Sequence, residues 1–184
     1  MLQINNREEL HKVINDLDLK VGVEVGVQEG LFSKYLLGNT KIELYLVDAW
    51  KHLENYKDIA NVPDWRQEQI LNVCKYNLSP YAGRYEIIRE LSVDASKLFG
   101  NNFFDFIYLD AGHSYSDITN DLNAWYPKLK SGGLMSGHDF LDGENICGSE
   151  FGVKSAVEDF IKGKNVELFV TKEAWPTWYF KKND

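Results

Sequence analysis

The sequence is short of cysteine and proline, and each shortage narrows the class of protein. Only two cysteines occur among 184 residues, Cys74 and Cys147, and they form no CxxC pair. Two cysteines are too few for a disulfide scaffold, so we expect a reducing compartment and a cytoplasmic protein. The four prolines leave no linker-like stretch, which favours a single domain over residues 1–184.

Long hydrophobic runs and an excess of positive charge are also missing. No apolar stretch approaches the roughly 20 residues of a membrane helix, and MLQINNREEL lacks the apolar core of a signal peptide. Lys and Arg total 20 against 28 Asp and Glu, a net charge of −8. Phosphate backbones repel such a chain, so we expect neither nucleic acid nor membrane as a partner. The sequence makes no prediction of oligomeric state.

What the chain does contain is an alternation of apolar strands and amphipathic helices. A first helix is indicated by the spacing of Leu10, Val13, Ile14 and Leu17, with Asn6 and Glu9 as a capping pair. Strands are expected at 21–26, 42–48, 84–90, 103–112 and 134–137, and a closing hairpin at 166–170 and 175–180. This order predicts a doubly wound α/β fold: a mostly parallel seven-stranded sheet with helices on both faces and a C-terminal antiparallel hairpin.

Polar residues follow every predicted strand, where ligands bind in sheets of this kind. In chain order they are Glu24 to Gly30, then Asp48 to Trp50, then Glu90 to Val93, then Asp110 to His113, and finally His138 and Asp139. Because the carboxyl ends of parallel strands meet at one edge, we expect these residues to form one site.

The first of these loops predicts a nucleoside ligand other than NAD. Gly26 and Gly30 are four residues apart, and Gln28 stands where the dinucleotide motif GxGxxG has its second glycine. Asp48, at the end of the second strand, suits paired ribose hydroxyls because a carboxylate accepts two hydrogen bonds. The same residues also fit ordinary turn glycines and a solvated strand end.

Two blocks of sequence resemble a known family. VEVGVQEGLFS looks like the nucleoside-binding loop of class I S-adenosylmethionine-dependent methyltransferases. DFIYLDAGHSYSDITNDLNAWYPKLKSGGLMSGHDF resembles the small O-methyltransferases of the macrocin and sugar-modifying group, which carry D-A-x-H-x-Y and G-H-D. The resemblance spans roughly residues 21–160 and implies a Rossmann-like methyltransferase domain that binds S-adenosylmethionine.

The resemblance also assigns the cofactor contacts. It implies that Glu24, Gly26 and Gly30 shape the methionine end of the pocket, that Asp48 holds the ribose, and that Gln28 and Asp110 also lie against the cofactor. Ala49 or Trp50 would lie against the adenine, with Ser92 and Val93 at its edge.

The residues after the fourth and fifth strands are expected to activate the acceptor, the group that receives the methyl. Metal-dependent relatives of the catechol O-methyltransferase kind place metal ligands where this chain has Asp110, His138 and Asp139, so a divalent metal is predicted, Mn or Mg, with the histidine favouring Mn. His113 occupies the slot of their lysine base and would be mostly neutral at pH 7. His113 also fits a capping role, and His138 also fits a buried hydrogen-bond partner of Asp139.

These assignments predict methyl transfer to a hydroxyl of a small molecule, a sugar or glycoside. His52, Tyr56, Trp65 and the segment Leu141 to Gly152 are placed to cover that acceptor. Two other functions fit parts of the pattern. A catalytically silent nucleoside-binding domain would explain Glu24, Gly26 and Asp48, and an NAD-dependent oxidoreductase is disfavoured by Gln28.

Overall fold

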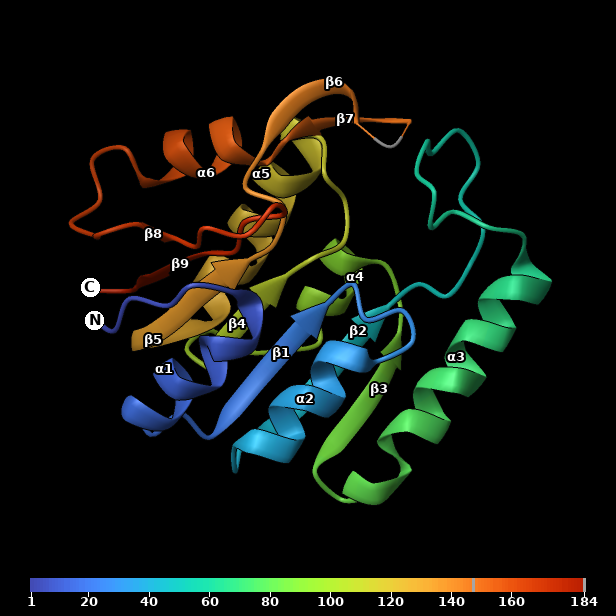
Figure 1. Ribbon diagram of the computed structural model, residues 1–184, viewed down its shortest axis with the longest axis horizontal. Coiled ribbons are helices and arrows are strands. Elements are labelled where there is room, and N and C mark those ends of the chain that lie inside the picture. Colours follow the sequence, from blue (N-terminus) through green and yellow to red (C-terminus); the bar gives the residue numbers. More distant parts are fainter. Residues whose placement is uncertain (147, 184) are drawn as a thin grey trace.

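A computed structural model describes residues 1–146 and 148–183 and confirms the predicted sheet (Figure 1). Its seven strands lie in the order β3-β2-β1-β4-β5-β9-β8. Their bounds are β1 Val21–Val25, β2 Glu43–Asp48, β3 Tyr85–Arg89, β4 Phe104–Leu109, β5 Leu129–Gly137, β8 Phe169–Val170 and β9 Trp178–Lys181. Strands β1 to β5 pair in parallel, whereas β9 runs antiparallel to β5 and to β8, as the predicted hairpin requires.

The strand order reverses between β1 and β4. From β1 the chain builds outward to β2 and β3, and it then returns to place β4 and β5 on the other side of β1. Loops that leave β1 and β4 therefore run in opposite directions and open a crevice at the carboxyl edge of the sheet.

Helices cover both faces of the sheet (Figure 1). One face carries α1 Leu10–Asp16, α2 Leu31–Asn39 and α3 Asp64–Leu78, and the other α4 Ser92–Ser96, α5 Tyr115–Trp125 and α6 Val153–Ile161. Successive strand residues face opposite layers, since Leu46 packs in the first core and Val47 in the second. None of the described helices has the length and apolar character needed to cross a membrane.

A short 3-10 helix, η1 Arg7–Glu9, precedes α1, and the predicted capping pair fixes it. The Asn6 Oδ1 atom accepts a hydrogen bond from the Glu9 backbone N–H at 3.1 Å. The Glu9 carboxylate accepts from the backbone N–H of Asn5 at 2.8 Å, one residue earlier than in the usual capping box. Two further 3-10 turns, η2 Ser79–Tyr81 and η3 Tyr126–Lys128, follow α3 and α5.

The segment expected to be a loop at 141–152 forms a small antiparallel hairpin instead. Its strands are β6 Asp142–Ile146 and β7 Ser149–Gly152, and Cys147 between them lies outside the described residues. The Ser149 hydroxyl donates to the Lys57 carbonyl at 2.7 Å. The hairpin therefore contacts the segment between β2 and α3, residues 49–63, across the carboxyl edge of the sheet (Figure 1).

Candidate functional site

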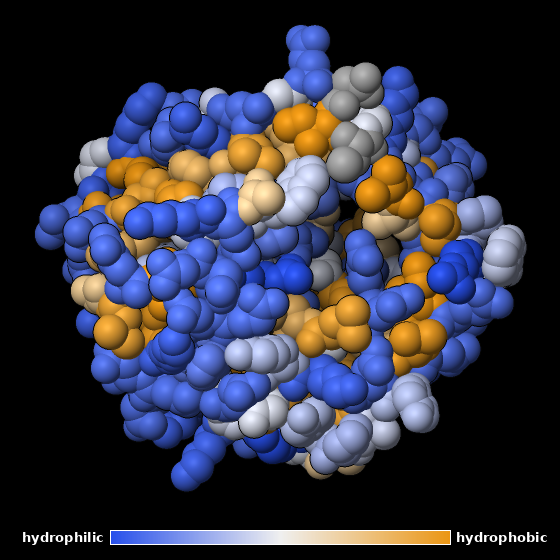
Figure 2. All heavy atoms as spheres, in the orientation of Figure 1, coloured by the Kyte–Doolittle hydropathy of each residue, from blue (hydrophilic) through white to orange (hydrophobic). Residues whose placement is uncertain are grey.

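A cavity of about 990 Å³ lies at this carboxyl edge. Residues that follow β1, β2, β3, β4 and β5 line it, together with parts of segment 49–63 and the β6–β7 hairpin. Figure 2 shows the hollow in this face of the molecule, with hydrophobic residues beside it. The volume is at the upper end of the range for small-molecule sites and leaves room for a cofactor and an acceptor.

The loop between β1 and α2 depends on its two glycines. Gly26 has a φ of +91°, and a Cβ atom there would lie 1.9 Å from the Asp110 carbonyl oxygen. Gly30 has a φ of +70°, and a Cβ atom there would lie 2.8 Å from the Cys74 Sγ atom. Gly26 and Gln28 line the cavity, whereas Gly30 does not and instead packs the start of α2 against α3. Gly30 therefore shapes the turn between β1 and α2 without itself facing the cavity.

Asp48 stands at the end of β2 and organises this loop. Its Oδ2 atom accepts from the backbone N–H groups of Val27 at 3.0 Å and Gln28 at 2.9 Å, and its Oδ1 atom accepts from that of Trp50 at 2.8 Å. The carboxylate lines the cavity. Both lone pairs of Oδ2 are therefore used by the loop, whereas Oδ1 keeps a second lone pair to which a hydroxyl donor can bind.

Trp50, one of the two residues expected against the adenine, does not line the cavity. The Trp50 side chain is fully buried, and its Nε1 atom donates to the Gln28 carbonyl at 3.0 Å, beneath the loop. A left-handed backbone, with a φ of +38°, accompanies this inward placement. Its neighbour Ala49 lines the cavity instead.

Ser92 and Val93 line the cavity near the end of β3, as predicted. The Ser92 hydroxyl is already paired, because it donates to Asp121 Oδ1 and accepts from Trp125 Nε1 at 2.9 Å. Burial raises the pKa of Asp121 to about 7. Sequence reasoning missed Asp121, whose position on α5 gives no signal of a site.

Glu24 is the buried acid of this site. Glu24 is the next-to-last residue of β1, is 2% exposed and accepts a hydrogen bond from the Ser33 hydroxyl at 2.5 Å. Burial outweighs that hydrogen bond and raises the pKa of Glu24 to about 8. The carboxyl group is therefore largely protonated at neutral pH and able to donate a hydrogen bond into the cavity.

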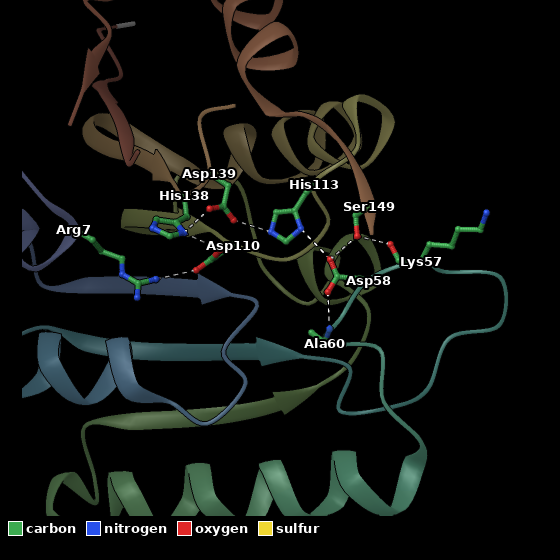
Figure 3. Close-up of polar contacts among 9 residues, drawn as sticks. All are labelled: Arg7, Lys57, Asp58, Ala60, Asp110, His113, His138, Asp139 and Ser149. Carbon is green, nitrogen blue, oxygen red and sulfur yellow. Dashed lines mark hydrogen bonds and ion pairs between the residues drawn. The ribbon is translucent and has the colours of Figure 1, made fainter. Parts of the chain in front are cut away.

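A line of polar contacts crosses the cavity floor (Figure 3). Arg7 Nη1 lies 3.3 Å from Asp110 Oδ2, and His138 Nδ1 lies 3.7 Å from Asp110 Oδ1 and 3.0 Å from Asp139 Oδ1. Asp139 Oδ2 then lies 3.0 Å from His113 Nε2. The structure thus brings together all four residues predicted for catalysis and metal binding.

His113 is held between two carboxylates. Its Nε2 atom faces Asp139, its Nδ1 atom lies 3.2 Å from Asp58 Oδ2, and its ring stacks on Phe151 with centroids 4.7 Å apart. Burial favours the neutral ring, but hydrogen bonds with Asp139 and Asp58 prevail and raise the pKa of His113 to about 10. This differs from the mostly neutral ring expected from the sequence, because sequence reasoning missed Asp58.

The pKa values of the two acids beside His138 shift in opposite directions. Burial, helped by the charge of Asp139, raises the pKa of Asp110 to about 6 despite the nearby His138 and Arg7. Burial acts the same way on Asp139, but hydrogen bonds from His113 and His138 hold the pKa of Asp139 well below its usual value. Asp139 is thus the stronger anion of the pair.

The donor set fits a divalent metal. One ligand atom from each of Asp110, His113 and Asp139 lies within 4.8 Å of the others. Two carboxylates with an imidazole suit a transition ion such as Mn²⁺. The group contains both predicted acid ligands, but its histidine is His113, from the loop after β4. The predicted histidine ligand, His138, lies beside the same acids.

The side of the cavity where the sequence places the acceptor is lined by aromatic residues. Tyr56 lies there as predicted, and Phe151 and Trp175 join it from the β6–β7 hairpin and from the turn before β9. Their ring centroids are 6.0 Å apart. His52 and Trp65 are not among the lining residues, and Trp65 is 66% exposed on α3. Sequence reasoning missed Trp175, which begins the second half of the predicted closing hairpin at 175–180.

Comparison with known structures defines the class of this fold. A protein from Staphylococcus aureus described as a proposed caffeoyl-CoA O-methyltransferase is 15% identical, covers 98% of this chain and 85% of its own, and has a TM-score of 0.71. The cofactor-bound protein Rv0187 of MTB is 10% identical over 97% and 80% of the two chains, with a TM-score of 0.71. A methyltransferase from Geobacter sulfurreducens is 10% identical over 99% and 81%, with a TM-score of 0.66. At these identities the likeness establishes the class I methyltransferase fold alone.

The sequence itself shows the family. A family model described as a methyltransferase domain matches residues 23–140, well over half of the chain. The chain therefore belongs to this methyltransferase family, whose methyl donor is S-adenosylmethionine. No curated protein matches the chain.

Proposed function

We propose that this chain, as one domain over residues 1–184, transfers a methyl group from S-adenosylmethionine to a hydroxyl of a small molecule, a sugar or glycoside. The observation that carries the proposal is a single cavity that contains both the Asp48 loop and the line from Asp110 to His113. Resemblance to the sugar-modifying group supports the acceptor class, and the negative charge of the chain argues against nucleic acid.

The protein's contribution is first one of placement. S-adenosylmethionine supplies an electrophilic methyl group, whose bond to sulfur breaks with the electron pair on sulfur as the acceptor oxygen bonds to the carbon. Asp48 and the β1–α2 loop would hold the donor on the β2 side. Phe151, Tyr56 and Trp175 would hold the acceptor ring against His113, and such alignment lowers the barrier by removing the entropic cost of encounter.

The hydroxyl proton has a candidate acceptor in His113. Asp139 orients the ring through Nε2, and Nδ1 points to Asp58 and the cavity. An acceptor hydroxyl that takes the place of the Asp58 carboxylate would pass its proton to a neutral Nδ1. Withdrawal of Asp58 favours that neutral state, because a nearby carboxylate stabilises the imidazolium.

A divalent metal would change the part that His113 plays. Asp110, Asp139 and His113 would hold the ion, which would lower the pKa of a hydroxyl bound to it. If His113 held the ion through Nε2, the neutral ring would keep its proton on Nδ1, so His113 would then be a ligand and no base. Chelation of the purified protein separates the two roles: activity lost on chelation and restored by Mn²⁺ favours the ligand, and full metal-free activity favours the base.

The function is tested first by binding and then by turnover. Calorimetry should show that S-adenosylmethionine binds and NAD does not. A screen of sugars, glycosides and phenols with labelled methyl donor should then give transfer to a hydroxyl of the first two classes. Binding of the donor with no transfer to any acceptor would favour the silent nucleoside-binding domain, and binding of NAD alone would favour the oxidoreductase.

A further inference from the structure

Arg7 is a cavity residue that lies outside the matched family segment, residues 23–140. Its backbone belongs to η1, which the Asn6 side chain caps. The residues before it are also tied down, since Ile4 donates its backbone N–H to the Tyr179 hydroxyl at 3.2 Å and that hydroxyl donates to the Leu2 carbonyl at 2.8 Å. The segment that carries Arg7 is therefore fixed to the sheet.

The Arg7 side chain is directed into the β4 side of the cavity (Figure 3). Its guanidinium lies over the Phe32 ring, with the Cζ atom 5.0 Å from the ring centroid, and its Nη1 atom is 3.3 Å from Asp110 Oδ2. The side chain remains 31% exposed. With one nitrogen engaged by Asp110, other N–H groups of the planar guanidinium remain as donors.

The proposed cofactor must present a carboxylate on this same side. The ribose acid Asp48 is on β2, and the adenine edge expected at Ser92 and Val93 is beyond it near β3. The amino-acid end must therefore extend the other way, across β1 towards β4. That end carries an ammonium and a carboxylate, and the Asp110 carboxylate suits the ammonium.

A cation is needed there for the carboxylate. Both ring nitrogens of His113 already face carboxylates, whereas Arg7 has further N–H donors. Among the described residues that line the cavity, the other lysine and arginine side chains are those of Lys51, which follows β2, and Arg66, which lies on α3. Both belong to the side where the ribose and adenine are expected. A guanidinium also binds a carboxylate through two parallel N–H donors, which an ammonium cannot do.

Resting on the proposed function, we infer that Arg7 binds the methionine carboxylate of S-adenosylmethionine and so fixes the position of the methyl group. Arg7 is then a cofactor-binding residue supplied by the N-terminal segment. Its contact with Phe32 and Asp110 holds the guanidinium in place before the cofactor arrives.

The test compares two ligands that differ in the amino-acid group. Calorimetry would measure binding of S-adenosylhomocysteine, which has the carboxylate, and of 5′-methylthioadenosine, which lacks the amino-acid group. For Arg7→Met we expect at least tenfold weaker binding of the first and a change within twofold for the second. Arg7→Lys keeps the charge but loses the paired donors, so its affinity for S-adenosylhomocysteine should be intermediate.

Lys12→Met is the matched control, because it removes one positive charge from α1 at a side chain that is 53% exposed. Both affinities should stay within twofold of the wild type. The inference is overturned if Arg7→Met leaves S-adenosylhomocysteine binding unchanged, or if it weakens both ligands equally. If Arg7→Met does not fold, Arg7→Lys decides by the same comparison. Wild-type protein that binds neither ligand would overturn the proposed function itself.

Discussion

At the scale of single residues, Asp48 has two tasks, one in the loop and one in the cavity. Its carboxylate holds the backbone N–H groups of Val27, Gln28 and Trp50 and also faces the cavity. Asp48→Asn keeps one oxygen acceptor but loses the charge, and we expect S-adenosylmethionine to bind about tenfold or more weakly, since hydrogen bonds to a charged group are worth roughly 1.5–3 kcal/mol. Calorimetry measures the affinity.

Asp48→Ala should cost stability in addition, because three loop N–H groups lose their acceptor. We expect the free energy of unfolding to fall by about 2–3 kcal/mol in urea titrations. Asp16→Asn, at an exposed acid on α1, is the control and should change neither quantity. Unchanged affinity in both Asp48 variants would remove this residue from the cofactor site.

His113 gives a second test at the residue scale, made on metal-free protein in chelator. The carboxylates of Asp139 and Asp58 raise the pKa of His113 to about 10, so the ring should stay protonated at neutral pH. Asp58→Asn removes one of the two charges, and the pKa of His113 should fall by about 1 or more. An NMR titration of the ring carbons measures this.

Glu54→Gln provides the control for that titration, because Glu54 is exposed on the same segment as Asp58. The His113 titration should be unchanged in this variant. A ring that already titrates between pH 6 and 7.5 in the wild type would contradict the contacts in Figure 3. Such a titration would support the mostly neutral His113 ring that the sequence predicted.

At the scale of elements, the turn from β1 into α2 is the part of the site that tolerates substitution least. Gly26→Ala would place a Cβ atom against the Asp110 backbone, with the added strain of a positive φ. Because backbone of β4's loop cannot move aside cheaply, we expect the free energy of unfolding to fall by about 3 kcal/mol or more. Chemical denaturation measures the loss.

Gly83→Ala is a matched control for this turn. Gly83 has a similar φ of +87°, but a Cβ atom there has no atom within 4 Å. Its cost should be limited to the backbone strain, about 1–2 kcal/mol. Equal losses in the two variants would show that the close approach of Gly26 to Asp110 contributes nothing.

At the scale of the whole molecule, Asp121 should make stability depend on pH. Burial raises the pKa of Asp121 to about 7 in the folded protein, whereas an unfolded aspartate titrates near 3.9. Between these values the folded state binds the extra proton, so stability should fall as pH rises from about 4 to 7 and then level off.

Asp121→Asn cannot ionise and keeps an oxygen for the Ser92 hydroxyl. Relative to the wild type, its free energy of unfolding should rise with pH over that interval, by roughly 2–4 kcal/mol in total. Urea titrations at pH 4.5, 6 and 8 measure the difference. A difference that is the same at all three values would mean that Asp121 is ionised in the folded protein throughout.

The fold was predictable because it follows from local patterns. Alternating apolar strands and amphipathic helices determine a parallel sheet, and a parallel sheet brings all its strand ends to one edge. That geometry is why Glu24, Asp48, Asp110 and Asp139 were expected in one site, and the structure places them around one cavity.

Only the tertiary structure decided which other side chains enter that cavity. Arg7 and Trp175 come from segments that follow no parallel strand, and Asp58 lies within segment 49–63, well beyond the end of β2. Trp50 does follow a strand, but its left-handed backbone accompanies burial of its ring in the core. The charge of His113 was decided in the same way, because Asp139 and Asp58 together raise its pKa. Asp58 is 55 residues away, and no local spacing encodes a contact made through the packing of two distant segments.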